Sequence, residues 1–144
     1  MQAASSPTSP APSRPATASW MRPALLAFAA ASLVQGLVLA LAPGAFYDAI
    51  AGFGARNDHF LRDNAAFYLA AAPALAVAAG RPSWRAPVLA LVALQFALHA
   101  LNHLLDIGDA DPSWVGPFDF ASLLVVAAVL GIMLRTALRE EDAR

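Results

Sequence analysis

Cysteine and lysine are both absent from this chain of 144 residues. Without cysteine there is no disulfide framework, no thiolate nucleophile and no cysteine-ligated metal site. The nine basic residues are all arginines and stand against ten acidic residues, so the formal net charge is −1. The sequence also lacks a basic block, a phosphate-binding loop, a dinucleotide fingerprint and a Ser-His-Asp set. We therefore expect no nucleic-acid partner, and no motif identifies a reaction.

Charge of either sign is scarce. Charged residues make up 13% of the chain and hydrophobic residues 59%, with a mean hydropathy of +0.57. A soluble domain carries roughly 25% charged residues. The deficit predicts a single-domain integral membrane protein whose surroundings are the lipid bilayer. A chain rich in alanine and arginine but free of lysine also suggests a bacterial source.

Four apolar runs predict four membrane-spanning helices, at about residues 23–42, 60–80, 86–105 and 117–138. Twenty helical residues extend about 30 Å, which is the thickness of the hydrocarbon core. No segment alternates with period two, so the predicted fold class is all-α, a polytopic four-transmembrane-helix bundle. Residues 45–53 (AFYDAIAGF) predict a short interfacial helix after the first span.

The remaining segments complete the domain organisation. Residues 1–19 are rich in Ser, Pro, Ala and Thr and predict a disordered cytoplasmic tail before the transmembrane domain of residues 20–138. Residues 139–144 are predicted to form a solvated cytoplasmic tail. Asn57 or Asp58 is a plausible N-cap for the second span, and Pro73 is expected to kink that span.

The arginines predict the direction of threading. Seven of the nine lie before the first span, between the second and third spans, or after the fourth, all on one side of the predicted bundle. The positive-inside rule makes that side cytoplasmic, so both termini are expected there, in a bacterial inner membrane. Trp20 and Trp84 fall at the inner boundary, and Tyr47 and Trp114 at the outer one, as aromatic belts require.

A polar stripe interrupts the third span. It contains Gln95, His99, Asn102, His103 and Asp106. Their spacings of four, three, one and three residues place them on one helical face. Polar groups in a span are costly unless they face the bundle interior, so this face is expected to point inward.

Other polar residues fall at similar depths in the remaining spans. Gln35 lies near the middle of the first span, His59 and Asp63 share a face at the outer start of the second, and Asp119 begins the fourth. Four spans can therefore converge on one polar pocket near the extracytoplasmic surface.

Three readings of that pocket remain open. His99 and His103 can share a divalent metal, with Asp106 or Asp63 completing the site. Alternatively, the pocket binds a small polar or amphipathic ligand, such as a quinone head group or a lipid. The residues assigned to ligand binding are His99, His103, Asp106, Asp63, His59, Asn102 and Gln95. In the third reading, the polar residues only pair across helices and hold the bundle together.

Three segments resemble the DoxX-like group of small bacterial four-helix membrane proteins. They are PGAFYDAIAGF after the first span, LRDNAAFYLAAAPAL at the start of the second, and LHALNHLLDIG at the end of the third. The resemblance covers about residues 23–138. It implies a four-span protein and an association with quinone-linked sulfur oxidation or with redox complexes.

These observations favour a membrane protein that binds a small ligand or metal, or that serves as an accessory membrane subunit. A membrane oxidoreductase component, using a quinone or a metal in the pocket, is one alternative. A purely structural partner of other membrane subunits is another.

Overall fold

The computed structural model describes residues 19–50 and 52–143, so residues 1–18 of the predicted tail lie outside the described part. Within it the chain is helical and forms no β-strand, which confirms the predicted all-α fold class. The elements are α1 (Met21–Leu41), α2 (Pro43–Ile50), α3 (Asp58–Gly80), the 3₁₀ turn η1 (Pro82–Trp84), α4 (Arg85–Leu105) and α5 (Val115–Asp142).

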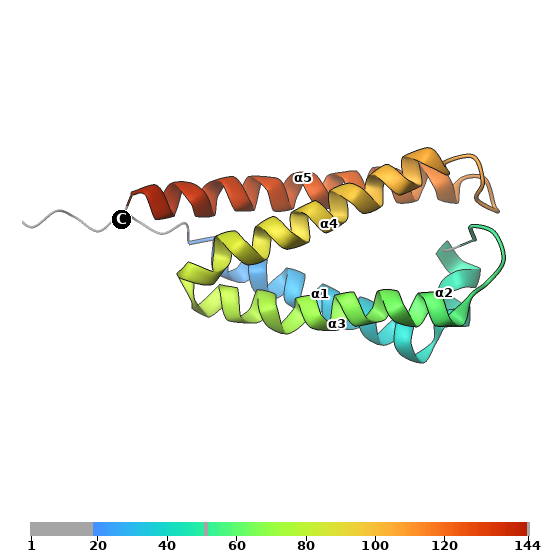
Figure 1. Cartoon of the computed structure of the whole chain (residues 1–144), viewed down its shortest axis with the longest axis horizontal. Coiled ribbons are helices and arrows are strands. Elements are labelled where there is room, and N and C mark those ends of the chain that lie inside the picture. Colours follow the sequence, from blue (N-terminus) through green and yellow to red (C-terminus); the bar gives the residue numbers. More distant parts are fainter. Residues whose placement is uncertain (1–18, 51, 144) are drawn as a thin grey trace, which may run out of the picture.

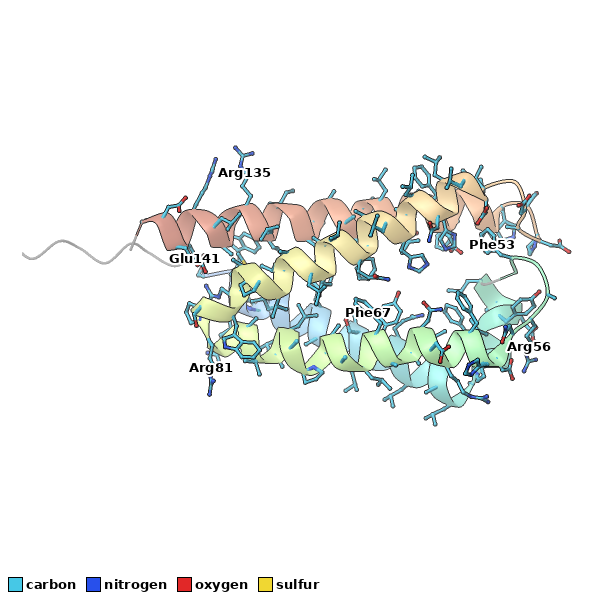
Figure 2. All side chains as sticks on the ribbon, viewed as in Figure 1. Phe53, Arg56, Phe67, Arg81, Arg135 and Glu141 are labelled. Atoms are coloured by element: carbon cyan, nitrogen blue, oxygen red, sulfur yellow. The ribbon has the colours of Figure 1, made fainter. Side chains whose placement is uncertain are left out.

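Two helix pairs build the molecule (Figure 1). α1 packs along α3 and α4 packs along α5, whereas the two pairs contact each other much less. The pairs meet at the end where α1 begins, η1 lies and α5 ends, and they diverge toward the end that carries α2. Arg81 and Arg135 mark the first end and Arg56 and Phe53 the second (Figure 2).

We call these the basic end and the acidic end. The basic end holds five of the seven arginines in the described residues. The acidic end carries seven of the ten acidic residues of the chain: Asp48, Asp58, Asp63, Asp106, Asp109, Asp111 and Asp119.

The half of the molecule nearer the basic end is a packed core. Its fully buried large side chains come from all four long helices, and alanines fill the spaces between them. These large side chains are Met21, Leu25, Leu75, Leu89, Leu130 and Met133. Small residues let helix backbones approach closely, which favours association where water does not drive it. Gly36 extends this close packing along α1, since a Cβ there would lie 2.8 Å from Cγ of Leu69 in α3.

A buried ion pair joins the helices at the basic end. Arg85, the first residue of α4, places Nη1 2.9 Å from Oε2 of Glu140 in α5. The two side chains are only 8% and 11% exposed. The Nε–H of Arg85 also points to the carbonyl oxygen of Ala78 in α3, at 3.4 Å. α5 continues to Asp142, past residue 138, and the side chain of Glu140 lies against Arg85 rather than in solvent.

The links at the acidic end are held together by backbone contacts. The N–H of Asp111 donates to the carbonyl oxygen of Gly52 at 2.9 Å, and Phe53 forms an isolated β-bridge with Ala110. A Cβ on Gly52 would lie 2.1 Å from the carbonyl oxygen of Asp111, so only glycine allows this approach. The interfacial helix predicted over residues 45–53 consequently ends at Ile50, and Phe53 belongs to the closing link.

The outer surface of the long helices is apolar. Large aliphatic residues such as Leu91, Val125 and Ile132 are exposed, while many of the buried hydrophobic residues are alanines. Among the described residues, three segments are long and apolar enough to cross a membrane: α1, Pro82–Leu105 and α5. α3 does not qualify, because it begins with charged residues and is rich in alanine. An apolar surface of this extent suits lipid contact, so the chain is an all-helical membrane protein.

Local signals set the limits of α3. Asn57 is its N-cap, as predicted, because its Oδ1 accepts a hydrogen bond from the Phe60 N–H at 3.1 Å. The helix continues through Pro73 and ends before Pro82, which opens η1. α3 thus runs beside α1 over its length and brings its polar first turns to the acidic end.

Candidate functional site: a cavity between the helix pairs

A cavity of about 960 Å³ lies between the two helix pairs, toward the acidic end. Residues from α1 to α5 and from the link after α2 line it. Eight of the ten phenylalanine and tyrosine residues of the chain are on its wall. They are Phe28, Phe46, Tyr47, Phe53, Phe60, Tyr68, Phe96 and Phe118. The bulky rings thus gather where the pairs diverge, in contrast to the alanines of the packed core.

The polar stripe of α4 faces this cavity. Gln95, His99, Asn102, His103 and Asp106 all line it. Other helices contribute polar side chains to the same wall: Gln35 and Ser32 from α1, Asn64 from α3, and Asp119 and Ser122 from α5. The stripe therefore forms part of the wall of a chamber that combines aromatic, aliphatic and polar side chains.

The two histidines of the stripe contact each other. The Nε2 atoms of His99 and His103 are 3.2 Å apart, as expected for an i, i+4 pair on one helical face. The ring of Phe53 meets the ring of His103 edge-on, with centroids 4.8 Å apart. The link after α2 therefore packs against the ring of His103, the histidine nearer the acidic end.

Asp119 lies on the other side of His103. Its Oδ2 is 3.9 Å from the Nδ1 of His103, which is beyond hydrogen-bond distance. The two side chains are 17% and 14% exposed. The Nδ1 of His103 is buried and has no hydrogen-bond partner among the described residues. An unsatisfied buried polar atom beside a cavity marks a position where a ligand or a water can bind.

The short contact between the imidazoles limits their protonation. One Nε2 must donate and the other must accept, so the contact holds only while at least one Nε2 is deprotonated. Two imidazolium groups would place two N–H donors against each other. The intact pair therefore carries at most one positive charge.

The same separation can be compared with a metal chelate. Two imidazole nitrogens on a tetrahedral zinc ion, each about 2.0–2.1 Å from the metal, are about 3.3 Å apart. The 3.2 Å between His99 and His103 is close to that value. Among the described residues, however, no three His, Asp or Glu side chains are grouped to hold a metal ion. A third protein ligand, which catalytic zinc sites use, is not provided by Asp106 or Asp63.

The structure does not bring His59 and Asp63 to the cavity. They pair with each other on the outside of α3, with His59 Nε2 3.5 Å from Asp63 Oδ2 and side chains 87% and 65% exposed. Asn64 and Tyr68 hold the cavity face of α3 instead. His59 and Asp63, which the sequence assigns to the ligand site, therefore do not line this cavity.

Sequence reasoning missed several residues of the wall. Phe53 was expected on an interfacial helix, yet it packs on His103. Neither Asn64 nor Ser122 is among the site residues predicted from the sequence, although Asn64 directly follows Asp63 and Ser122 lies about one turn after Asp119. The signal that was available is the clustering of aromatic residues near the predicted outer boundary, in segments 46–68 and 96–118.

The two arginines of the acidic end lie away from the cavity wall. Arg56 makes two hydrogen bonds to Asp58, from Nε at 2.6 Å and from Nη2 at 3.0 Å, and covers Gly44. These hydrogen bonds from the guanidinium lower the pKa of the Asp58 carboxyl. Outside the chamber, Tyr47, Asp48, Asp109 and Asp111 border a second, more open hollow of about 470 Å³.

Comparison with protein-family models, with curated proteins and with solved structures finds no match to this chain. The fold and the apolar surface define its class, an all-helical membrane protein with a cavity between two helix pairs. The resemblance to DoxX-like proteins stays a prediction based on three sequence segments.

Proposed function

We propose that this protein is a four-span protein of the bacterial inner membrane with both termini in the cytoplasm. α3 has 23 residues, enough to extend about 34 Å. It packs along α1, which is apolar enough to span, so the two helices would occupy the same depth of the bilayer. The charged residues of α3 lie near its start, at the acidic end. The surplus of arginine at the opposite end supports a cytoplasmic position for that end.

The absence of cysteine makes this topology directly testable. Ala55→Cys and Asp109→Cys lie at the acidic end, and Ser83→Cys lies at the basic end. We expect a membrane-impermeant maleimide to label the first two in intact spheroplasts and to label Ser83→Cys only after the membrane is opened. Labelling of Ala55→Cys and Ser83→Cys from the same side would show that α3 does not cross.

Within that topology, the function best supported is the binding of a small amphipathic molecule in the cavity. The observation that carries it is the cavity itself, about 960 Å³, lined by eight phenylalanine and tyrosine residues, by aliphatic residues and by polar side chains from all four long helices. Ligand sites are commonly about 300–1,000 Å³, mostly apolar, with a few polar groups that orient the ligand. The apolar part of the ligand would lie among the rings, and its polar group would face His99, His103 and Asn102.

A purely structural role for the polar stripe is less well supported. Residues that hold a bundle together by hydrogen bonds across helices are expected to pair with each other. Here the stripe faces a cavity, and the buried Nδ1 of His103 has no hydrogen-bond partner among residues 19–50 and 52–143. A bound polar group, or a water held between the ligand and the wall, would satisfy this atom.

Filling the cavity tests the proposal. Ser122→Trp would place an indole in the chamber, whereas Val125→Trp, one turn away on the same helix, would place it on the exposed surface. Organic extracts of the three proteins, purified in maltoside micelles, are compared by mass spectrometry. We expect a species retained by the native chain and by Val125→Trp but lost from Ser122→Trp. Identical extracts from all three proteins would overturn the proposal.

A further inference from the structure

The charges on the cavity wall narrow the class of ligand. Asp106 at the end of α4 and Asp119 in the first turns of α5 both line the chamber. No arginine lines it among the described residues, and the chain contains no lysine. A phosphate, sulfate or carboxylate head group would therefore enter without a permanently charged partner, which is costly away from water.

The histidine pair does not outweigh the negative charge of the two carboxylates on the cavity wall. While the 3.2 Å contact between the Nε2 atoms holds, His99 and His103 together carry at most one positive charge. The formal charge of the two carboxylates exceeds it. A positive charge on the ligand would neutralise the negative charge of the cavity wall, whereas a negative charge on the ligand would be repelled by it.

The aromatic rings favour the same class of ligand. Ring faces attract cations, and sites for quaternary ammonium groups are commonly built from several aromatic side chains. One of the carboxylates lies near such rings: Phe118, which precedes Asp119 in the chain, lines the same cavity, and Phe53 packs on His103 beside Asp119. An apolar tail could extend toward Tyr68 and Phe96, whose rings meet edge-on deeper in the chamber, with centroids 6.2 Å apart.

The surface of the acidic end, around the cavity, is also negatively charged. Among the described residues, the acidic end holds seven of the ten acidic side chains and only two arginines, Arg56 and Arg62. Arg56 is engaged by Asp58. A negative field of this kind raises the local concentration of cations at the mouth of a site.

Resting on the proposed function, we propose that the cavity binds a lipophilic ammonium-type cation. The positive head group is held by Asp106, Asp119 and the surrounding rings, and the apolar tail extends between the helix pairs. The chemistry is that of an amphiphilic amine or quaternary ammonium compound.

The test compares probes that share one tail and differ in charge. Radiolabelled dodecyltrimethylammonium, neutral dodecyldimethylphosphine oxide and anionic dodecylphosphonate are each dialysed against the full chain in maltoside micelles. Binding that is lost in Ser122→Trp is counted as cavity binding. Asp106→Asn and Asp119→Asn remove one carboxylate each, and Glu141→Gln removes an exposed one at the opposite end as the control.

We expect the cation to bind at least about tenfold more tightly than the neutral probe, and each Asp→Asn variant to lose about tenfold of that affinity. Affinity for the neutral probe should be unchanged, and Glu141→Gln should match the native chain. Asp106 lies at an exposed helix end, so its variant gives a reading even where Asp119→Asn fails to fold.

The outcomes separate this inference from the proposed function. Equal cavity binding of cation and neutral probe, or tighter binding of the anion, would overturn the cation preference and leave an amphiphile site in place. Cation binding that is unaffected by either Asp→Asn variant would also overturn it. Binding of no probe that depends on residue 122 would overturn both proposals.

Discussion

The two halves of this molecule use different residues between the same four long helices. Near the basic end, small side chains and fully buried Leu and Met residues bring all four helices into one core. Near the acidic end, aromatic rings and polar side chains stand between the pairs, and a cavity of about 960 Å³ results. Large rings facing inward hold backbones apart, whereas alanine lets them close. The contrast suggests that one half supplies rigidity and the other supplies a site.

Breaking the buried ion pair at the basic end should have the largest effect on the stability of the molecule. Arg85→Ala removes the guanidinium that pairs with the carboxylate of Glu140, in a site where both side chains are almost buried. Loss of one partner of a buried pair costs about 3–5 kcal/mol. We expect the free energy of unfolding, measured by denaturant titration in mixed micelles, to fall by that amount.

A double variant separates the contribution of the two charges from that of the other contacts of these side chains. Arg85→Met/Glu140→Leu replaces both charges with apolar side chains, which is often neutral in buried positions. We expect it to recover most of the loss. If the double variant is as unstable as Arg85→Ala, the stability of the basic end comes from other contacts of these side chains rather than from their charges.

Truncating one large side chain in each half compares the halves directly. Leu89 is fully buried in the packed core, so Leu89→Ala should cost about 3 kcal/mol through lost contacts and a new cavity. Phe96 is the larger side chain but borders an existing cavity, so Phe96→Ala should cost only about 1 kcal/mol. Equal losses in thermal or denaturant unfolding would mean that the acidic half is as tightly packed as the basic half.

Ligand binding can be compared between variants of a histidine inside the cavity and a histidine outside it. His99 lines the cavity, and His59 lies outside on α3. The phosphine oxide probe presents a strong hydrogen-bond acceptor, which an imidazole N–H can satisfy. We expect His99→Ala to weaken its binding by about tenfold, the effect of about 1.4 kcal/mol, and His59→Ala to leave it unchanged. A similar loss of affinity in both variants would mean that His59 also belongs to the binding site.

Much of this arrangement could be predicted from the sequence, and the reasons for the exceptions are physical. The inward stripe of α4 is readable because its polar residues repeat at helical spacing against leucines on the other faces. The first turns of α3 contain polar residues on every side, NDHFLRDN, so periodicity does not select the face that bears Asn64 over the one that bears His59.

Two other features depend on contacts that hydropathy does not encode. Arg85 and Glu140 are 55 residues apart, and nothing local marks either as buried rather than solvated. The cavity arises from the relative volumes of rings and alanines on facing helices, while a hydropathy scale treats both as apolar. Pattern therefore predicted the helices and one face of α4, and packing determined the site.

The smallest expected effect concerns pH at the acidic end. Hydrogen bonds from Arg56 lower the pKa of Asp58 in the folded chain relative to the unfolded one. A lowered folded-state pKa contributes stability that is fully present above the ordinary aspartate value, about 3.9, and is lost as pH falls through the folded-state pKa. Thermal midpoints of the native chain and of Asp58→Asn, measured in maltoside micelles, should differ slightly and constantly above about pH 5 and converge below about pH 4. Because the pair is exposed, salt should reduce the difference as well. A difference in thermal midpoint that persists at the lowest pH would mean that residue 58 acts through its position at the start of α3 and not through the charge of the aspartate.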